Sequence, residues 1–198
     1  SGILLVGMVF YMGKIMISPA GVDPAELAGL QSNAMIVGLV VIFAGAAVYD
    51  VLWKMVFADK QPVGVAVSFA LVVGLMYAMT EVLHFADRAM FIHVGAMFGT
   101  AMAMNVWMRI WPAQRKIIAA IKAGDKPDAA WGAMAGLRSK HNTYMSVPLI
   151  FMMLNAHTTA GLPSGIPSWA NLAIVTAVGW LFTNWVYKKS KTDAPAFY

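Results

Sequence analysis

The chain contains no cysteine among its 198 residues. This absence excludes disulfide bonds, thiolate zinc sites, iron–sulfur clusters and covalent attachment of a c-type haem within the chain. Charged residues are also scarce, at 12% of the sequence, whereas hydrophobic residues make up 60%. A soluble domain carries about twice that charged fraction. The composition therefore favours one membrane domain and excludes a separate soluble catalytic domain.

Apolar segments dominate what is present, and the sequence shows no phosphate-binding glycine loop, nucleophile elbow or zinc-protease helix. Short polar breaks separate six such segments, at residues 2–17, 33–58, 63–83, 88–111, 142–157 and 168–187. A helix that spans a bilayer needs about 20 apolar residues. We therefore predict an all-α, polytopic transmembrane helix bundle of about six spans. Residues 1–189 form one membrane domain with a surface connector at 112–140, and residues 190–198 form a C-terminal tail.

Lys and Arg are concentrated in alternate breaks. They occur at Lys54 and Lys60, throughout the connector and after residue 187, whereas the breaks at 18–31, 84–87 and 158–167 are acidic, neutral or nearly balanced. Cytoplasmic loops carry the excess of Lys and Arg. The pattern predicts a bacterial inner (cytoplasmic) membrane protein with a cytoplasmic C-terminus. The net charge of +5 then indicates contacts with membrane lipid and not with nucleic acid.

The connector contains one stretch with helical amphipathic character. Residues 114–123 alternate basic and aliphatic side chains, among them Arg115, Ile118 and Lys122. This pattern fits a short cytoplasmic amphipathic helix lying on the inner membrane surface. It fits equally well a solvated loop helix that packs against the bundle.

The histidines are the main candidates for chemistry, because ionisable groups inside a membrane are costly and default to functional roles. His93 and His157 are predicted at similar depth near the periplasmic side, on different helices. Two neutral imidazoles facing an apolar slot are what axial ligation of a haem b iron requires. Thr100 or Asn155 could then accept hydrogen bonds from the ring N–H groups. The alternative is that a membrane histidine simply hydrogen-bonds a neighbouring helix.

His141 is predicted at the cytoplasmic end of the fifth segment, about 24 Å along the helix axis from His157. It could bind a second haem only with a partner from outside the sequence. Asp50 and Lys54, four residues apart, favour a local ion pair over a proton relay.

Several stretches together resemble one family. They are Asp23-Pro24-Ala25, Val48-Tyr49-Asp50-Val51-Leu52, AMFIHVGAMFGTAMAMNVWMRIWPAQR at 89–115, and RSKHNTYMSVPLIFMMLNAH at 138–157. The chain resembles the membrane domain of the bacterial membrane-bound, cytochrome c-linked urate oxidases (urate hydroxylases). The resemblance covers residues 1–189. The further spans and the C-terminal cytochrome c of family members lie outside that stretch, and His84 does not fall on the pattern.

The resemblance implies oxidation of urate to 5-hydroxyisourate, a step of purine catabolism, with electrons leaving toward a periplasmic c-type cytochrome. The positions that match the pattern are His93, Asn105, Gln114, His141, Asn142, Tyr144 and His157.

Three hypotheses follow from these observations. The first is a redox membrane domain, an oxidoreductase of urate-oxidase type that binds haem b and works with other membrane subunits. The second is a non-catalytic accessory membrane subunit of a respiratory or photosynthetic complex, whose histidines are structural or hold pigment or lipid. The third is a transporter-like proton or solute path through Asp50 and His141, which ranks last because no broken-helix pair is evident.

Overall fold

Helices make up nearly all of the fold. The computed structural model describes residues 7–57, 60–155 and 165–193, with side chains described through residue 190. Within these ranges the only β-type pairing is one antiparallel bridge between Ile17 and Phe85. The all-α prediction is therefore confirmed. The elements in chain order are η1 (Gly7–Met12), α2 (Pro24–Met55), α3 (Gln61–Tyr77), η2 (Ala78–Val82), α4 (Asp87–Met104), η3 (Asn105–Ile110), α5 (Trp111–Lys122), α6 (Ala129–Asn155) and α7 (Ser168–Asp193).

Three helices in the described ranges are long and apolar enough to cross a membrane. They are α2, the continuous helix formed by α3 and η2, and the continuous helix from Asp87 to Lys122. Helices α6 and α7 fall outside this group, because α6 carries Arg138, Lys140 and His141 in mid-helix and polar residues such as Asn171, Thr176 and Asn184 are spread along α7. The chain therefore has membrane-compatible helices, and the six-span count stays a prediction.

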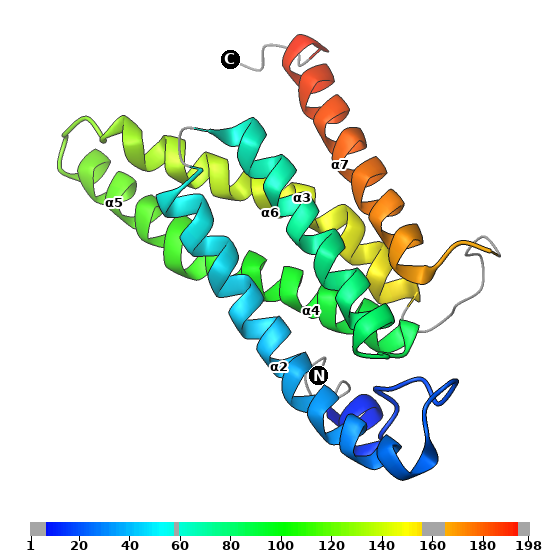
Figure 1. Cartoon of the computed structure of the whole chain (residues 1–198). Coiled ribbons are helices and arrows are strands. Elements are labelled where there is room, and N and C mark those ends of the chain that lie inside the picture. The colour runs from blue at the N-terminus through cyan, green and yellow to red at the C-terminus, as the bar shows by residue number, and fades with distance from the viewer. Residues whose placement is uncertain (1–6, 58–59, 156–164, 194–198) are drawn as a thin grey trace.

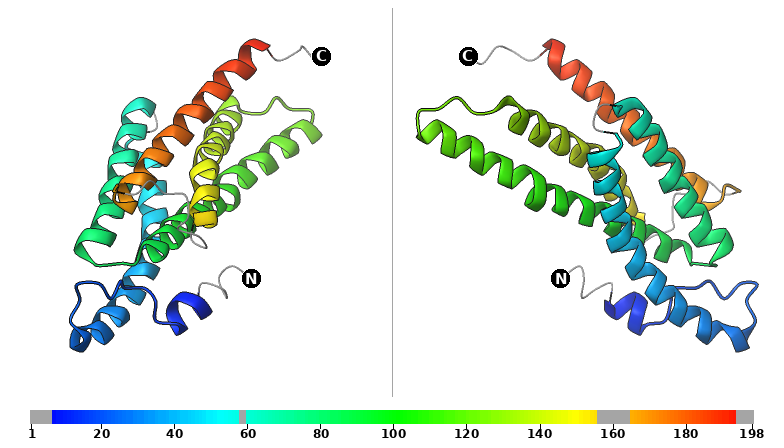
Figure 2. Two further views of the ribbon diagram at one scale, coloured as in Figure 1. Left: turned by 90° about the vertical axis from the view of Figure 1, so that its right-hand side faces the viewer. Right: turned by 60° about the vertical axis from the view of Figure 1, so that its left-hand side comes forward.

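Helix α4 is the centre of the bundle. Helix α2 packs on it from one side and α6 from the other, while α7 packs on α6 and α3 packs on α7 (Figure 1). Seven consecutive residues of α4, from Ala89 to Gly95, are buried, so this stretch is covered on every side. The two views of Figure 2 show the N-terminal segment beside the first half of α2.

The N-terminal segment is tied to the start of α4 by backbone hydrogen bonds. The Ala86 amide donates to the Met16 carbonyl over 2.8 Å, and the Ser18 amide donates to the His84 carbonyl over 3.0 Å. Gln31 of α2 adds its side-chain oxygen, which accepts from the Met16 amide at 3.0 Å. These bonds hold the described part of the first apolar segment, a six-residue π-helix followed by non-helical chain, against α2 and α4.

One sequence prediction about an element boundary is wrong. Residues 24–31, predicted as loop, are the first turns of α2, because Asp23 caps the helix by accepting from the Ala25 amide at 2.9 Å and Pro24 suits the first helical position.

The amphipathic stretch is helical, as predicted. It is α5, which continues α4 through the π-helical turn η3 and packs against α6 (Figure 1). Of the two predicted alternatives, the structure therefore agrees with the helix that packs against the bundle.

Glycine allows α2 to approach α4 closely. A Cβ atom built on Gly38 would lie 2.7 Å from the His93 ring and 2.9 Å from the Tyr11 hydroxyl oxygen. Gly95 serves the same purpose on the other side of α4, where a Cβ would lie 3.3 Å from Met152 of α6. Gly95 thus allows α6 to approach α4, whereas Gly99 faces open space.

We predict that Gly38→Ala destabilises the protein by about 1–3 kcal/mol, because the added methyl group overpacks the α2–α4 contact. The matched control is Gly99→Ala, also in a helix interior. It should leave the free energy of unfolding unchanged or raise it by about 0.5–1 kcal/mol, since alanine favours helix more than glycine does. Thermal unfolding in detergent micelles checks both. Equal effects of the two substitutions would contradict the packing described.

Candidate functional site

A buried ionic cluster joins three helical elements at its centre. Asp50 of α2 accepts a bidentate pair of hydrogen bonds from Arg109 of η3, of which the bond from Nε is 3.0 Å long. Arg138 of α6 places Nη2 at 3.2 Å from the same carboxylate. Asp50 is 9% exposed and Arg138 only 4%. Two guanidinium groups therefore share one carboxylate, so this cluster carries one uncompensated positive charge.

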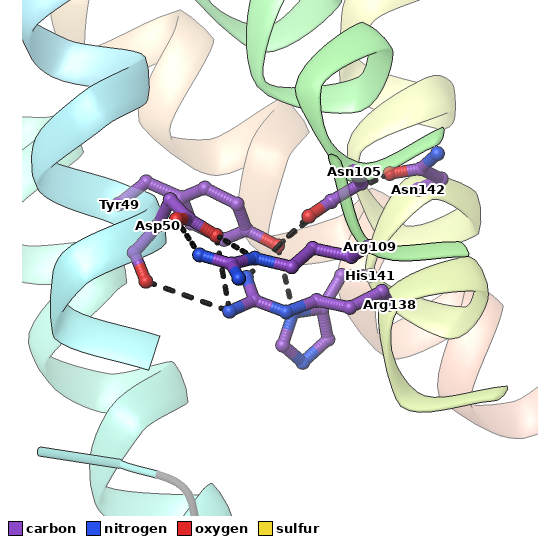
Figure 3. A network of polar contacts seen from close by, with 7 residues as sticks. All are labelled: Tyr49, Asp50, Asn105, Arg109, Arg138, His141 and Asn142. Carbon is purple, nitrogen blue, oxygen red and sulfur yellow. Dashed lines mark hydrogen bonds and ion pairs between the residues drawn. The ribbon is translucent and has the colours of Figure 1, made fainter. Parts of the chain in front are cut away.

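Neutral polar side chains extend this cluster toward His141 (Figure 3). Arg138 Nη1 donates to Asn105 Oδ1 at 3.4 Å. Asn105 Nδ2 donates to the Tyr49 hydroxyl at 2.9 Å and to Asn142 Oδ1 at 2.8 Å. The Tyr49 hydroxyl in turn lies 2.8 Å from His141 Nδ1. We call these seven side chains the polar network: Tyr49, Asp50, Asn105, Arg109, Arg138, His141 and Asn142.

The polar network fixes the proton of the His141 ring. Arginine only donates, so Asn105 must turn its oxygen toward Arg138 and its NH₂ group toward Tyr49. The Tyr49 oxygen therefore accepts from Asn105, and among the described contacts Nδ1 of His141 is the acceptor offered to the Tyr49 proton. In a neutral imidazole the other nitrogen then carries the hydrogen. His141 accordingly presents an Nε2–H donor on the side away from Tyr49.

The other end of the polar network gives the same orientation independently. Asn142 Nδ2 donates to the backbone carbonyl of Met102 at 3.2 Å, and a carbonyl can only accept. Asn142 must therefore turn its oxygen toward Asn105, whose nearest atom is the NH₂ nitrogen. The contacts of Arg138 and of Asn142 therefore assign the same orientation to the Asn105 amide group.

His93 has the opposite tautomer. Its Nδ1 lies 2.7 Å from the Ala89 carbonyl, which can only accept, so Nδ1 carries the hydrogen. Nε2 is left as an acceptor, and the Tyr11 hydroxyl donates to it over 3.0 Å. The ring is fully buried, and Phe10 and Phe85 each meet it edge-on at a centroid distance of 6.2 Å.

The surroundings of these two histidines do not fit axial haem ligation. Iron binds an unprotonated nitrogen. His93 has the right tautomer, but Tyr11 occupies its Nε2 and Gly38 lies against the ring. At His141 the Tyr49 hydroxyl favours the tautomer with the hydrogen on Nε2, which disfavours iron binding at that atom. His157 lies outside the described residues, so its pairing with His93 stays a prediction.

Other predicted site residues have clear positions. The acceptor for the His93 N–H is the Ala89 carbonyl, whereas Asn155 donates to the Phe151 carbonyl at 3.1 Å. Neither Thr100 nor Asn155 therefore accepts from the His93 ring, and their predicted role toward His157 lies outside the described residues. Gln114 is exposed on α5. In the described part of the chain, no group of three or more His, Asp or Glu side chains could hold a metal ion.

The predicted ion pair between Asp50 and Lys54 is also wrong, since the carboxylate pairs with arginines of two other elements. A helical partner four residues away competes poorly here, because the guanidinium fork of Arg109 matches both carboxylate oxygens. Sequence reasoning missed Arg138 and Tyr49 as site residues. The sequence places Arg138 in the basic surface connector at 112–140. Only an earlier start of the following helix, at Ala129, would have indicated that Arg138 is buried.

A cavity of about 880 Å³ lies directly beside the polar network. Helices α2, α3, α4, α6 and α7 all contribute to its wall, and most of the wall is apolar. His141 and Tyr49 line it where it meets the polar network, together with Trp53, whose ring centroid is 4.2 Å from that of His141. Cavities of this size and character are typical ligand sites.

We predict that His141 and His93 carry their protons on different ring nitrogens, Nε2 and Nδ1 respectively. Nitrogen NMR of histidine-labelled protein distinguishes the two tautomers, and substitution of each histidine assigns its signals. Tyr49→Phe should abolish the Nε2–H preference of His141 and leave His93 unchanged. The same tautomer at both residues would contradict the hydrogen-bond directions given above.

Comparison with known proteins gives one result. No curated protein and no solved structure matches the chain. A family model described as "Urate oxidase N-terminal" matches residues 1–197, which is nearly the whole chain. The chain therefore belongs to the urate oxidase N-terminal family.

Proposed function

We propose that the chain is the membrane domain of a urate-oxidase-type oxidoreductase. The observation that carries the proposal is the family match over residues 1–197. Urate and one water would yield 5-hydroxyisourate, releasing two protons and two electrons. The electrons would leave toward a periplasmic c-type cytochrome, which takes one electron per haem.

The proposal includes a bacterial inner-membrane location with about six spans and a cytoplasmic C-terminus. Its support is the distribution of Lys and Arg along the chain and the three helices long enough to cross a bilayer. Helices α6 and α7 would complete the bundle, with their polar halves at the cytoplasmic side. The polar network then lies at the inner end of α2, where its extra positive charge agrees with the positive-inside rule.

The proposal does not route electrons through haem b. His93 is bonded at both ring nitrogens by groups of this chain, and the tautomer of His141 opposes iron binding. Binding of haem b between His93 and His157 remains a separate prediction, which an absorption spectrum of the purified protein tests directly. A haem band lost in His93→Ala and kept in His84→Ala would support it, and a colourless protein would reject it.

A second candidate function is that of a non-catalytic accessory membrane subunit. One observation favours it: the full pairing of His93 with Tyr11 and Ala89 is what a purely structural histidine shows. On this reading the chain would assist a respiratory or photosynthetic complex and would not act on urate itself.

We predict urate-dependent reduction of added ferricytochrome c by membrane vesicles that contain the chain with its native membrane partners. Two cytochromes should be reduced per urate consumed, because urate gives up two electrons. Vesicles from cells lacking the chain are the control. Unchanged urate consumption without the chain would contradict the oxidase proposal and favour the accessory subunit.

A further inference from the structure

We propose that the cavity beside the polar network binds a lipid-soluble quinone, with the carbonyl-bearing ring at the His141 end. This goes beyond the proposed function and does not depend on it, because binding needs no urate. The cavity lies among helices α2, α3 and α4, which are apolar enough to cross a membrane, so a membrane-dissolved ligand is the natural occupant.

Hydrogen-bond donors predominate around the polar end of the cavity. His141 presents Nε2–H, because Tyr49 donates to its other nitrogen. Asn184 accepts from the Tyr144 hydroxyl at 3.2 Å, which leaves its NH₂ group to donate. Lys140, a donor with no acceptor capacity, lines the same end. This set favours a ligand whose polar atoms are acceptors only.

Trp180 and Asn184 place an aromatic ring and an amide side by side on the cavity wall. Trp180 lines the cavity with its ring, whereas its Nε1 atom is buried against protein and does not reach the cavity. Asn184 offers its NH₂ group there. Because Trp180 and Asn184 are four residues apart on α7, they lie on one face of that helix, one turn from each other.

The shape of the cavity also suits a quinone. Its volume of about 880 Å³ is large enough for a ring with an apolar tail, and aromatic side chains can stack on the ring. Trp53 lies beside His141, while Trp180 meets Phe69 at a centroid distance of 5.7 Å. Farther from His141, the wall carries aliphatic residues, including Leu71, Val72 and Leu75 of α3.

Donor chemistry decides between a quinone and urate as the occupant. A quinone has carbonyl oxygens that only accept, and it matches the donors of His141, Asn184 and Lys140. Urate has several N–H groups, each of which needs an acceptor when it leaves water. Because the wall is mostly apolar, urate would lose more hydrogen bonds to water than it could form with the cavity wall.

The test is equilibrium binding of decylubiquinone to the purified full chain in detergent micelles, without urate. His141→Phe should weaken binding about tenfold, because it removes one hydrogen bond to the quinone carbonyl. Asn184→Leu provides a second cavity variant, also with about a tenfold loss. The control is His84→Ala, which removes an exposed histidine outside the cavity wall and should leave the affinity unchanged.

Decylbenzene and urate are the comparison ligands. We expect decylbenzene, which has the tail but no carbonyl, to bind at least tenfold more weakly than decylubiquinone. Equal binding of the two, with no effect of His141→Phe, would overturn the proposal and show a cavity for lipid tails. Binding of urate with no binding of decylubiquinone would overturn it in favour of a substrate site. Absence of binding by all three ligands would also overturn it.

Discussion

Asp50 receives two guanidinium groups, one from η3 and one from α6, and this carboxylate is the point where three helical elements meet. A buried charge is tolerated only when it is paired and hydrogen-bonded. Asp50 meets this condition, and so does Arg138, which also lies over the Tyr49 ring at 5.4 Å. The ion pairs fix Arg138, Arg138 orients Asn105, and Asn105 orients Tyr49. The position of the proton on the His141 ring thus depends on the Asp50 carboxylate through four successive contacts.

The two described membrane histidines have different roles because different groups hold their Nδ1 atoms. A backbone carbonyl holds Nδ1 of His93, so its Nε2 accepts, and Tyr11 satisfies that nitrogen inside a sealed aromatic cage. A tyrosine hydroxyl lies at Nδ1 of His141, so the hydrogen is favoured on its Nε2, and this residue lines a large apolar cavity. His93 therefore acts within the fold to join the N-terminal segment to α4. His141 is the histidine available to a ligand.

The sequence predicted the helices well and the polar contacts poorly, for a physical reason. Apolar runs report directly on helix position, and the third segment, predicted at 63–83, is found at 61–82. Ion pairs between helices depend on how those helices pack, which the sequence does not report. The sequence predicts an ion pair between Asp50 and its helical neighbour Lys54. In the structure Asp50 instead pairs with Arg109, fifty-nine positions away. Asn105, His141 and Asn142 were found through the family pattern, and only the structure unites them with Asp50.

The central claim is that Asp50 and Arg138 act as one coupled unit. A double-mutant cycle of Asp50→Asn and Arg138→Gln tests it, with the free energy of unfolding measured in mixed detergent micelles. Each single substitution should cost about 3–5 kcal/mol, because it leaves a buried charge or donor without its partner. The double variant should cost less than the sum, with a coupling of about 1–3 kcal/mol. Costs that add to within about 0.5 kcal/mol would contradict the account.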